Sequence, residues 1–138
     1  DNHSPQVIEE PARGGSERIM IIDDEQDIID LAAETLTMYG YKITTFSDGI
    51  QAMQDFEKHP DDYELVITDM AMPNMTGLDV THKIKGIRPN LPIILCSGYS
   101  EIINKEKSLA LGISKYIQKP LIMDNLARVI RELLDMAS

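Results

Sequence analysis

The chain has 138 residues, of which 43% are hydrophobic and 26% are charged, a composition typical of one globular domain. Its formal net charge of −10 argues against nucleic acid as a partner, because affinity for phosphates depends on an excess of Lys and Arg. No apolar run approaches the roughly 20 residues of a membrane-spanning helix, and no basic-then-apolar leader is present, so we expect a cytoplasmic segment without membrane contact. The single cysteine, Cys96, excludes an internal disulfide and leaves oxygen atoms as the expected ligands of any metal.

Residues 1–17 contain two prolines and two glycines and show little apolar periodicity. This composition predicts a flexible tail or an interdomain linker. From Arg18 onward, short apolar runs alternate with amphipathic segments, and we expect one domain over residues 18–136.

Strand and helix patterns alternate five times along this domain. The apolar runs predict strands at Ile19–Ile22, Tyr41–Phe46, Leu65–Thr68, Ile93–Cys96 and Ser114–Gln118. The first, third and fourth runs are nearly continuous, which is typical of strands buried on both faces of a parallel sheet. Between the runs, the apolar residues follow helical spacing.

Three of the intervening helices have clear signals. The first has apolar residues on one face and ends before Gly40, a common C-terminal stop. Asp48 with Gln51 resembles a capping box at the start of the second. The last has the most regular stripe, formed by Leu126, Val129, Ile130, Leu133 and Leu134.

Five strand–helix units predict an α/β fold, a doubly wound (βα)₅ three-layer sandwich around a five-stranded parallel sheet. A closed eightfold barrel needs about twice this length. Right-handed crossovers place helices on both faces of the sheet.

Polar side chains follow four of the five strands, and ligands of such folds bind beyond the carboxyl ends of the strands. The residues are Asp23, Asp24 and Glu25 after the first strand, Asp69 at the end of the third, Ser97 after the fourth, and Lys119 with Pro120 after the fifth. Converging carboxylates repel one another unless a cation lies between them, and Mg²⁺ (or Mn²⁺) suits a site with few protein ligands. A carboxylate nucleophile, a metal, a lysine and a hydroxyl together favour phosphoryl transfer.

These residues also carry a resemblance to a known family. The run Ile21–Glu25, the run Thr68–Gly77, the run Ser97–Tyr99 and the pair Lys119–Pro120 are similar to the motifs of response-regulator receiver domains. The resemblance extends from about Arg18 to Met136. It implies a flavodoxin-like sheet with the strand order 2-1-3-4-5.

The resemblance also implies a role for each site residue. Asp69 is the expected phospho-acceptor, and Lys119 is expected to contact the phosphoryl group and to form a cis peptide bond with Pro120. Asp24 is expected to bind Mg²⁺ directly, and Asp23 directly or through a water. The main-chain carbonyl of Ala71 completes the expected protein ligands.

Two further residues match switch positions of the family. Phosphorylation is expected to draw Ser97 inward and to let Tyr116 turn inward, which changes the surface of the fourth helix, fifth strand and fifth helix. Ser97 stands where threonine is commoner and keeps the hydroxyl. Ala71 and Tyr99 occupy positions that, in the family, tune the lifetime of the phosphoryl group through water access.

The implied partners are proteins. The phosphodonor would be a histidine kinase or a histidine phosphotransfer domain, and a downstream effector or a phosphorylation-dependent dimer would receive the signal. Such a receiver catalyses its own phosphorylation and dephosphorylation and is not a free-standing metabolic enzyme. The chain begins with Asp1, and the string Ser97–Tyr99 is common in receivers fused to hybrid histidine kinases, which favours a segment of a longer protein.

Three alternatives are weighed against this interpretation. A pseudo-receiver would keep the fold as an interaction module without phosphorylation, but such proteins usually lose an acid or the lysine. A haloacid-dehalogenase-type phosphatase needs a second aspartate where this chain has Ala71. A flavin mononucleotide binder needs a phosphate loop rich in Ser, Thr and Gly where this chain has Asp23, Asp24 and Glu25.

Overall fold

The sheet contains five parallel strands in the order β2-β1-β3-β4-β5, as expected. The computed structural model describes residues 12–98 and 112–137. Within them the strands are β1 (Arg18–Ile22), β2 (Lys42–Phe46), β3 (Leu65–Asp69), β4 (Ile93–Ser97) and β5 (Lys115–Gln118). Each strand begins and ends within one residue of its predicted bounds, so the doubly wound α/β prediction is confirmed.

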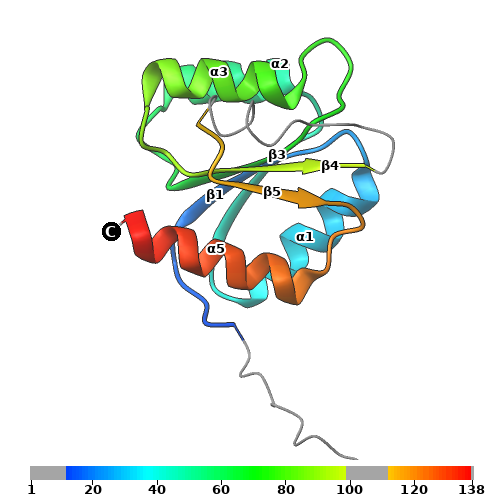
Figure 1. Ribbon diagram of the computed structural model, residues 1–138, viewed down its shortest axis with the longest axis vertical. Helices are drawn as coiled ribbons and strands as arrows, with labels where there is room; N and C mark the ends of the chain where they lie inside the picture. Colours follow the sequence, from blue (N-terminus) through cyan, green and yellow to red (C-terminus); the bar gives the residue numbers. More distant parts are fainter. Residues whose placement is uncertain (1–11, 99–111, 138) are drawn as a thin grey trace, which may run out of the picture.

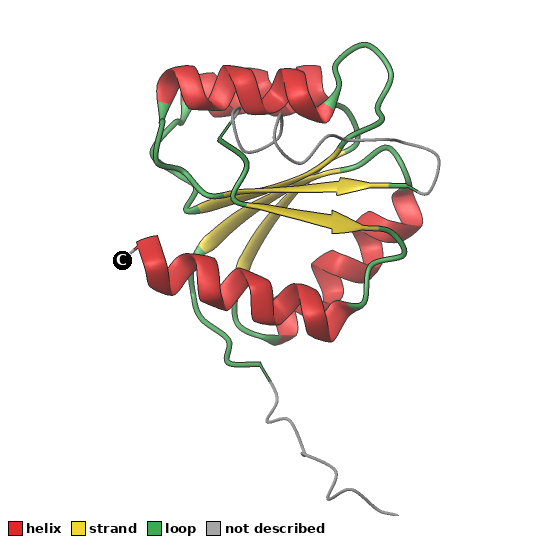
Figure 2. Ribbon diagram, in the orientation of Figure 1, coloured by secondary structure: helices red, strands yellow, loops and turns green. Residues whose placement is uncertain are grey.

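Helices cover both faces of this sheet (Figure 1). They are α1 (Gln26–Met38), α2 (Gly49–Lys58), α3 (Gly77–Ile87) and α5 (Met123–Ala137). Figure 2 shows α2 and α3 above the sheet and α1 and α5 below it, which gives the three expected layers. The expected fourth helix falls in residues 99–111, outside the described residues. None of the described helices has the length and apolar character needed to span a bilayer.

The core consists of two apolar clusters, one on each side of the sheet. Successive side chains of a strand point to opposite faces. In β1, Ile19 and Ile21 therefore join the cluster under α1 and α5, whereas Met20 and Ile22 join the cluster under α2 and α3. Burial on both faces explains why the strand sequences are continuously apolar.

Local sequence signals fix the ends of several helices. The Asp48 carboxylate accepts a hydrogen bond from the backbone N–H of Gln51 at 2.7 Å, as a helix N-cap does. Gly40 follows α1 with φ of 100°, the left-handed conformation that favours glycine. At α3, Thr76 and Asp79 form a reciprocal capping box that was not predicted from the sequence.

Residues 12–17, which belong to the expected tail or linker, contact the rest of the domain. The backbone N–H of Gly15 donates to the Tyr39 carbonyl at 3.1 Å, and the Lys42 N–H donates to the Glu17 carbonyl at 3.0 Å. The packed part of the chain therefore starts before Arg18.

Candidate functional site

The carboxyl edge of the sheet holds two buried aspartates. Asp69 is the last residue of β3 and lies opposite Cys96 of β4. Asp23 directly follows β1, and the side chains of both aspartates are only 4% exposed. Burial of carboxylates is costly unless they are paired or hydrogen-bonded. Their position therefore calls for compensating groups.

A third acid joins them at the surface. Carboxylate oxygens of Asp23, Asp24 and Asp69 all lie within 4.8 Å of one another. Asp24 is exposed, so the cluster opens to solvent on one side. The structure therefore brings together the three acids that the sequence placed after two different strands.

Lys119 supplies the compensating positive charge. Its Nζ lies 2.9 Å from Asp23 Oδ2 and 3.2 Å from Asp69 Oδ1, and its side chain is 11% exposed. Burial alone would lower the pKa of Lys119, but the hydrogen bonds and charges of Asp23 and Asp69 outweigh it and raise that pKa. Lys119 is therefore a stable cation between the two buried acids.

The backbone around Lys119 is equally well fixed. Its N–H donates to the Ser97 carbonyl at 2.7 Å, which ties the end of β5 to the end of β4. The Lys119–Pro120 peptide bond is cis, the isomer implied by the resemblance. The hydrogen bond places Lys119 at the same edge of the sheet as Ser97.

Asp23 also serves the fold. Its Oδ1 accepts the backbone N–H of Glu25 at 2.9 Å, immediately before α1. The other oxygen, Oδ2, faces Lys119. One side chain with two oxygens therefore supports the start of the first helix and also joins the site.

The proton affinity of Asp69 is strongly perturbed. Burial, and then the negative charge of Asp23, raise the pKa of Asp69 to about 7, although Lys119 opposes the increase. Any positive charge added near Asp69 would favour its ionised form. Perturbed acids in a cluster are typical of functional sites.

Ser97 and Tyr116 meet beside this cluster. Ser97 is the last residue of β4 and is fully buried, and its hydroxyl is hydrogen-bonded to the Tyr116 hydroxyl of β5. The structure thus brings the two expected switch residues into direct contact. Tyr99, the third residue of the Ser97–Tyr99 motif, lies outside the described residues.

Two contacts at the site were not foreseen. The Glu25 carboxylate lies 3.8 Å from Lys119 Nζ, so a third acid, after Asp23 and Asp69, shares the lysine. Gly77 lies so close to the Asp69 carbonyl that a Cβ atom at this position would overlap it, and its N–H donates to the Met70 carbonyl at 2.9 Å. The glycine is visible in the sequence, but its close approach emerges only from the fold.

The donor set fits a small divalent cation. Asp23, Asp24 and Asp69 offer hard oxygen ligands within one small volume, and Mg²⁺ prefers such ligands at about 2.1 Å while keeping several waters. Ala71 lies in the exposed loop after Asp69, where its carbonyl stays a predicted ligand. The exposed side of Asp24 leaves room for the waters.

The parallel sheet and its acidic edge define a flavodoxin-like domain of the receiver class. Residues 19–131 match the family model described as response regulator receiver domain. The chain belongs to this family.

Individual relatives agree with this assignment. The chain is 35% identical over 112 residues to the transcriptional regulatory protein KdpE of Mycobacterium tuberculosis, covering 80% of this chain and 48% of that protein. It is 29% identical over 123 residues to sporulation initiation phosphotransferase F of Bacillus subtilis, covering 89% of this chain and 98% of that protein. A solved receiver domain from Clostridium thermocellum has a TM-score of 0.82 at 28% identity, covering 87% of this chain and 95% of that chain.

Several of the matching relatives are longer than this chain. The chain spans about half the length of the transcriptional regulatory proteins that it matches, with coverage of 52%, 49% and 48% in three of them. What those names say of transcription applies to those longer proteins.

Proposed function

We propose that the chain is a phosphorylatable receiver domain that accepts a phosphoryl group from a phosphohistidine onto Asp69 in a Mg²⁺-dependent reaction. The observation that carries this proposal is the buried Asp69 carboxylate, which shares Lys119 with Asp23 and lies within 4.8 Å of Asp23 and Asp24. A structural acid at the end of a strand needs no such group of charges. A phospho-acceptor does, because charge builds up during transfer.

The metal would be held by Asp23, Asp24, Asp69 and the carbonyl of Ala71. When bound, Mg²⁺ (or Mn²⁺) supplies positive charge that offsets the carboxylates and attracts a phosphoryl oxygen. It also favours the ionised form of Asp69, whose pKa is about 7 without it. Ionised Asp69 is the nucleophile that the reaction requires.

The protein groups then act on the transferred phosphoryl. An oxygen of Asp69 forms a bond to phosphorus while the bond from phosphorus to the donor imidazole nitrogen breaks, and the imidazole keeps the electron pair and takes up a proton. Lys119 neutralises a phosphoryl oxygen, and the Ser97 hydroxyl donates to another. Hydrolysis is the attack of water on the same phosphorus, so the domain catalyses both formation and loss of its own modification.

The output is a change of surface. Phosphorylation adds about −1.5 to −2 charges. We propose that Ser97 and Tyr116 respond to it and alter the face formed by the fourth helix, β5 and α5. The fourth helix lies outside the described residues, so this part of the proposal rests on β5, α5 and the hydrogen bond between Ser97 and Tyr116.

The proposed partners are proteins of the phosphorelay. A histidine kinase or a histidine phosphotransfer domain would supply the phosphoryl group, and an effector, a fused domain or a second copy of the chain would receive the signal. The formal net charge of −10 disfavours direct binding of nucleic acid. We propose a cytoplasmic receiver over residues 18–136, with residues 12–17 packed against it, within a longer protein such as a hybrid histidine kinase.

Radioactive labelling from acetyl phosphate tests the acceptor. Wild type should take up one phosphoryl group per chain with Mg²⁺ and none in EDTA, and Asp69→Asn should take up none. Asp61→Asn is the matched control, because Asp61 is exposed in the loop before β3 and outside the site. Full labelling of Asp69→Asn would show that the acceptor is wrong.

A metal titration separates this function from that of a pseudo-receiver. Addition of Mg²⁺ should shift the amide resonances of Asp24 and Asp69 in wild type, and Mn²⁺ should broaden them. A silent titration, together with absent labelling, would favour a non-phosphorylated interaction module.

A further inference from the structure

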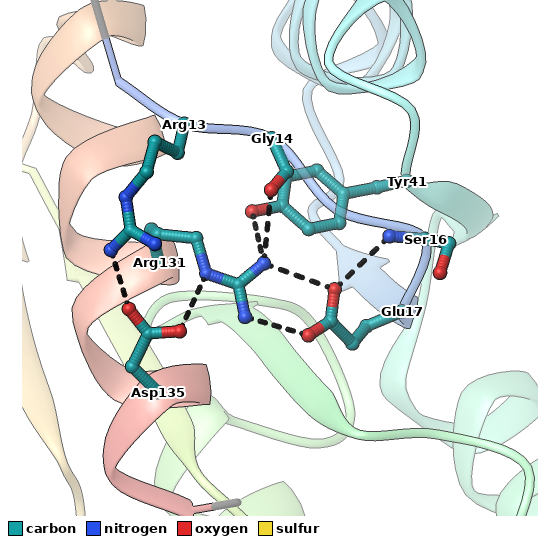
Figure 3. Close-up of polar contacts among 7 residues, drawn as sticks. All are labelled: Arg13, Gly14, Ser16, Glu17, Tyr41, Arg131 and Asp135. Carbon is teal, nitrogen blue, oxygen red and sulfur yellow. Dashed lines mark hydrogen bonds and ion pairs between the residues drawn. The ribbon is translucent and has the colours of Figure 1, made fainter.

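Residues 12–17 form a segment, here called the clasp, that lies between the end of α1 and the side of α5 (Figure 3). Its backbone is hydrogen-bonded to Tyr39 and Lys42, and Ala12 packs against the apolar cluster under α1 and α5. The clasp is therefore part of the folded domain, although its composition is that of a linker.

Arg131 of α5 is the centre of the clasp. Its two terminal nitrogens bind the two oxygens of Glu17 at 2.7 and 3.2 Å, a bidentate pair, and one of them also donates to the Gly14 carbonyl at 3.1 Å. The side chain is 13% exposed. Paired arginine and carboxylate groups of this geometry are among the stronger polar contacts in proteins.

A second ion pair extends the network along α5. Asp135 accepts from the Arg131 Nε at 3.0 Å and from Arg13 at 2.6 Å (Figure 3). Arg131 and Asp135 are one helical turn apart. The charges thus alternate from Arg13 through Asp135 and Arg131 to Glu17, and both charged clasp residues are held by α5.

The glycines of the clasp are required for close approach. A Cβ atom on Gly14 would overlap the Tyr39 carbonyl, and one on Gly15 would overlap Glu17 and Arg131. The facing Gly40 has a φ of 100°, and a Cβ atom there would overlap the Gly15 carbonyl. Gly14 and Gly15 are typical of a flexible linker in the sequence. In the fold they allow two backbones to pack closely.

The helix that holds the clasp also starts beside the acidic site. α5 begins at Met123, four residues after Lys119, which binds Asp69. Its buried residues Leu126 and Ile130 pack in the core under the sheet, and Arg131 follows Ile130 directly. A shift at the first turn of a packed helix moves its last turns as well.

We propose that the clasp anchors the polypeptide on the amino-terminal side of Ala12 to α5, so that a movement of α5 is passed to that polypeptide. The anchoring stands on the contacts above. The transmission rests on the proposed function, because it needs a phosphorylation-dependent movement of α5.

Trypsin cleavage of the whole 138-residue chain tests the anchoring. Cleavage after Arg13 requires the clasp to leave α5, so we expect it to be slow in wild type and about tenfold faster in Arg131→Gln. Gly14→Ala should have the same effect with all charges retained. Arg18→Gln is the matched control, because the Arg18 side chain is exposed and lies 4.0 Å from Asp62, away from the clasp contacts.

The cleavage rates decide the anchoring for variants whose circular dichroism shows a native fold. Faster cleavage in Arg131→Gln and Gly14→Ala, with an unchanged rate in Arg18→Gln, supports it. Equal rates in wild type and Gly14→Ala, or equal rates in Arg131→Gln and Arg18→Gln, overturn it.

Amide resonances test the transmission. Beryllium fluoride with Mg²⁺ mimics a phosphoryl group and should shift the amides of Asp69 and of Gly14 and Gly15 in wild type. In Arg131→Gln, only the shift at Asp69 should persist. A shift at Asp69 without one in the clasp overturns the transmission and leaves the proposed function intact. No shift at Asp69 overturns the proposed function and the transmission together.

Discussion

Replacement of Asp69 by asparagine should stabilise the metal-free domain, and the gain should depend on pH. Asp69 is nearly buried beside Asp23, and Lys119 is shared between the two. The asparagine side chain would keep the shape of the aspartate and remove one buried charge. The predicted effect comes from the cost of ionising Asp69 in this position.

The raised pKa of Asp69 sets the size of the effect. The pKa is about 7 in the folded chain and ordinarily 3.8, so the folded chain binds this proton more readily than the unfolded chain. The resulting stabilisation is complete below the ordinary pKa and is lost as the pH rises towards 7. At about 1.4 kcal/mol for each pKa unit, wild type should lose about 2–3 kcal/mol from pH 5 to pH 8 that Asp69→Asn does not lose.

Urea unfolding at several pH values between about 5 and 8 measures this difference. The two proteins share all other ionisable groups, so the comparison isolates Asp69 and its neighbours. Saturating Mg²⁺ should shrink the difference, because a bound cation favours the carboxylate. Asp61→Asn should follow wild type at every pH. Parallel stability curves for wild type and Asp69→Asn in EDTA would refute the reasoning.

Three further predictions concern groups around the site. Lys119→Gln leaves two buried acids without their cation and should lower the free energy of unfolding in EDTA by about 3 kcal/mol. Mg²⁺ should restore part of this loss. A variant as stable as wild type in EDTA would contradict the prediction. Gly77→Ala should cost about 2 kcal/mol or more, because its Cβ would overlap the Asp69 carbonyl. Gly86→Ala, in the same helix, should be neutral or stabilising by up to about 1 kcal/mol, because among the described residues its Cβ would meet no atom within 4 Å beyond the neighbouring helix backbone. Urea unfolding measures both effects, and equal effects would exclude the steric cause. Cys96 is 1% exposed and burial raises its pKa to about 12, so Ellman's reagent should modify it only on unfolding; rapid reaction of the native chain would contradict its placement.

The sheet and most of the acidic cluster were predictable because they follow from two simple patterns. Apolar runs such as Ile93–Cys96 are buried on both faces and therefore show continuous hydrophobicity. In a parallel sheet the carboxyl ends of the strands share one edge, so Asp23 and Asp69 must meet once the strand order is given. That order was the one part of the fold prediction taken from the resemblance.

Contacts that depend on the packing of two distant backbones were not predictable. Gly14 and Gly15 gave the signal of a flexible segment, because a sequence does not show which surface a glycine approaches. Their partner, the turn at Gly40, and the Arg131 side chain lie far away in the chain. The place of Glu25 beside Lys119 is of the same kind, since an exposed acid at the start of a helix has many possible directions.

At the acidic site, metal binding and folding stability are thermodynamically linked. Lys119 compensates two of the clustered acids, and Asp24 faces the solvent, so the metal-free domain keeps an unfavourable charge at its sheet edge. A ligand that binds one site of the folded state only stabilises that state by RT ln(1 + [L]/Kd). Variants that relieve the repulsion, such as Asp69→Asn, should therefore gain stability without metal and respond less to its addition. The free energy of unfolding, measured with and without Mg²⁺ for each variant, thus reports how much the charge of each acid destabilises the metal-free site.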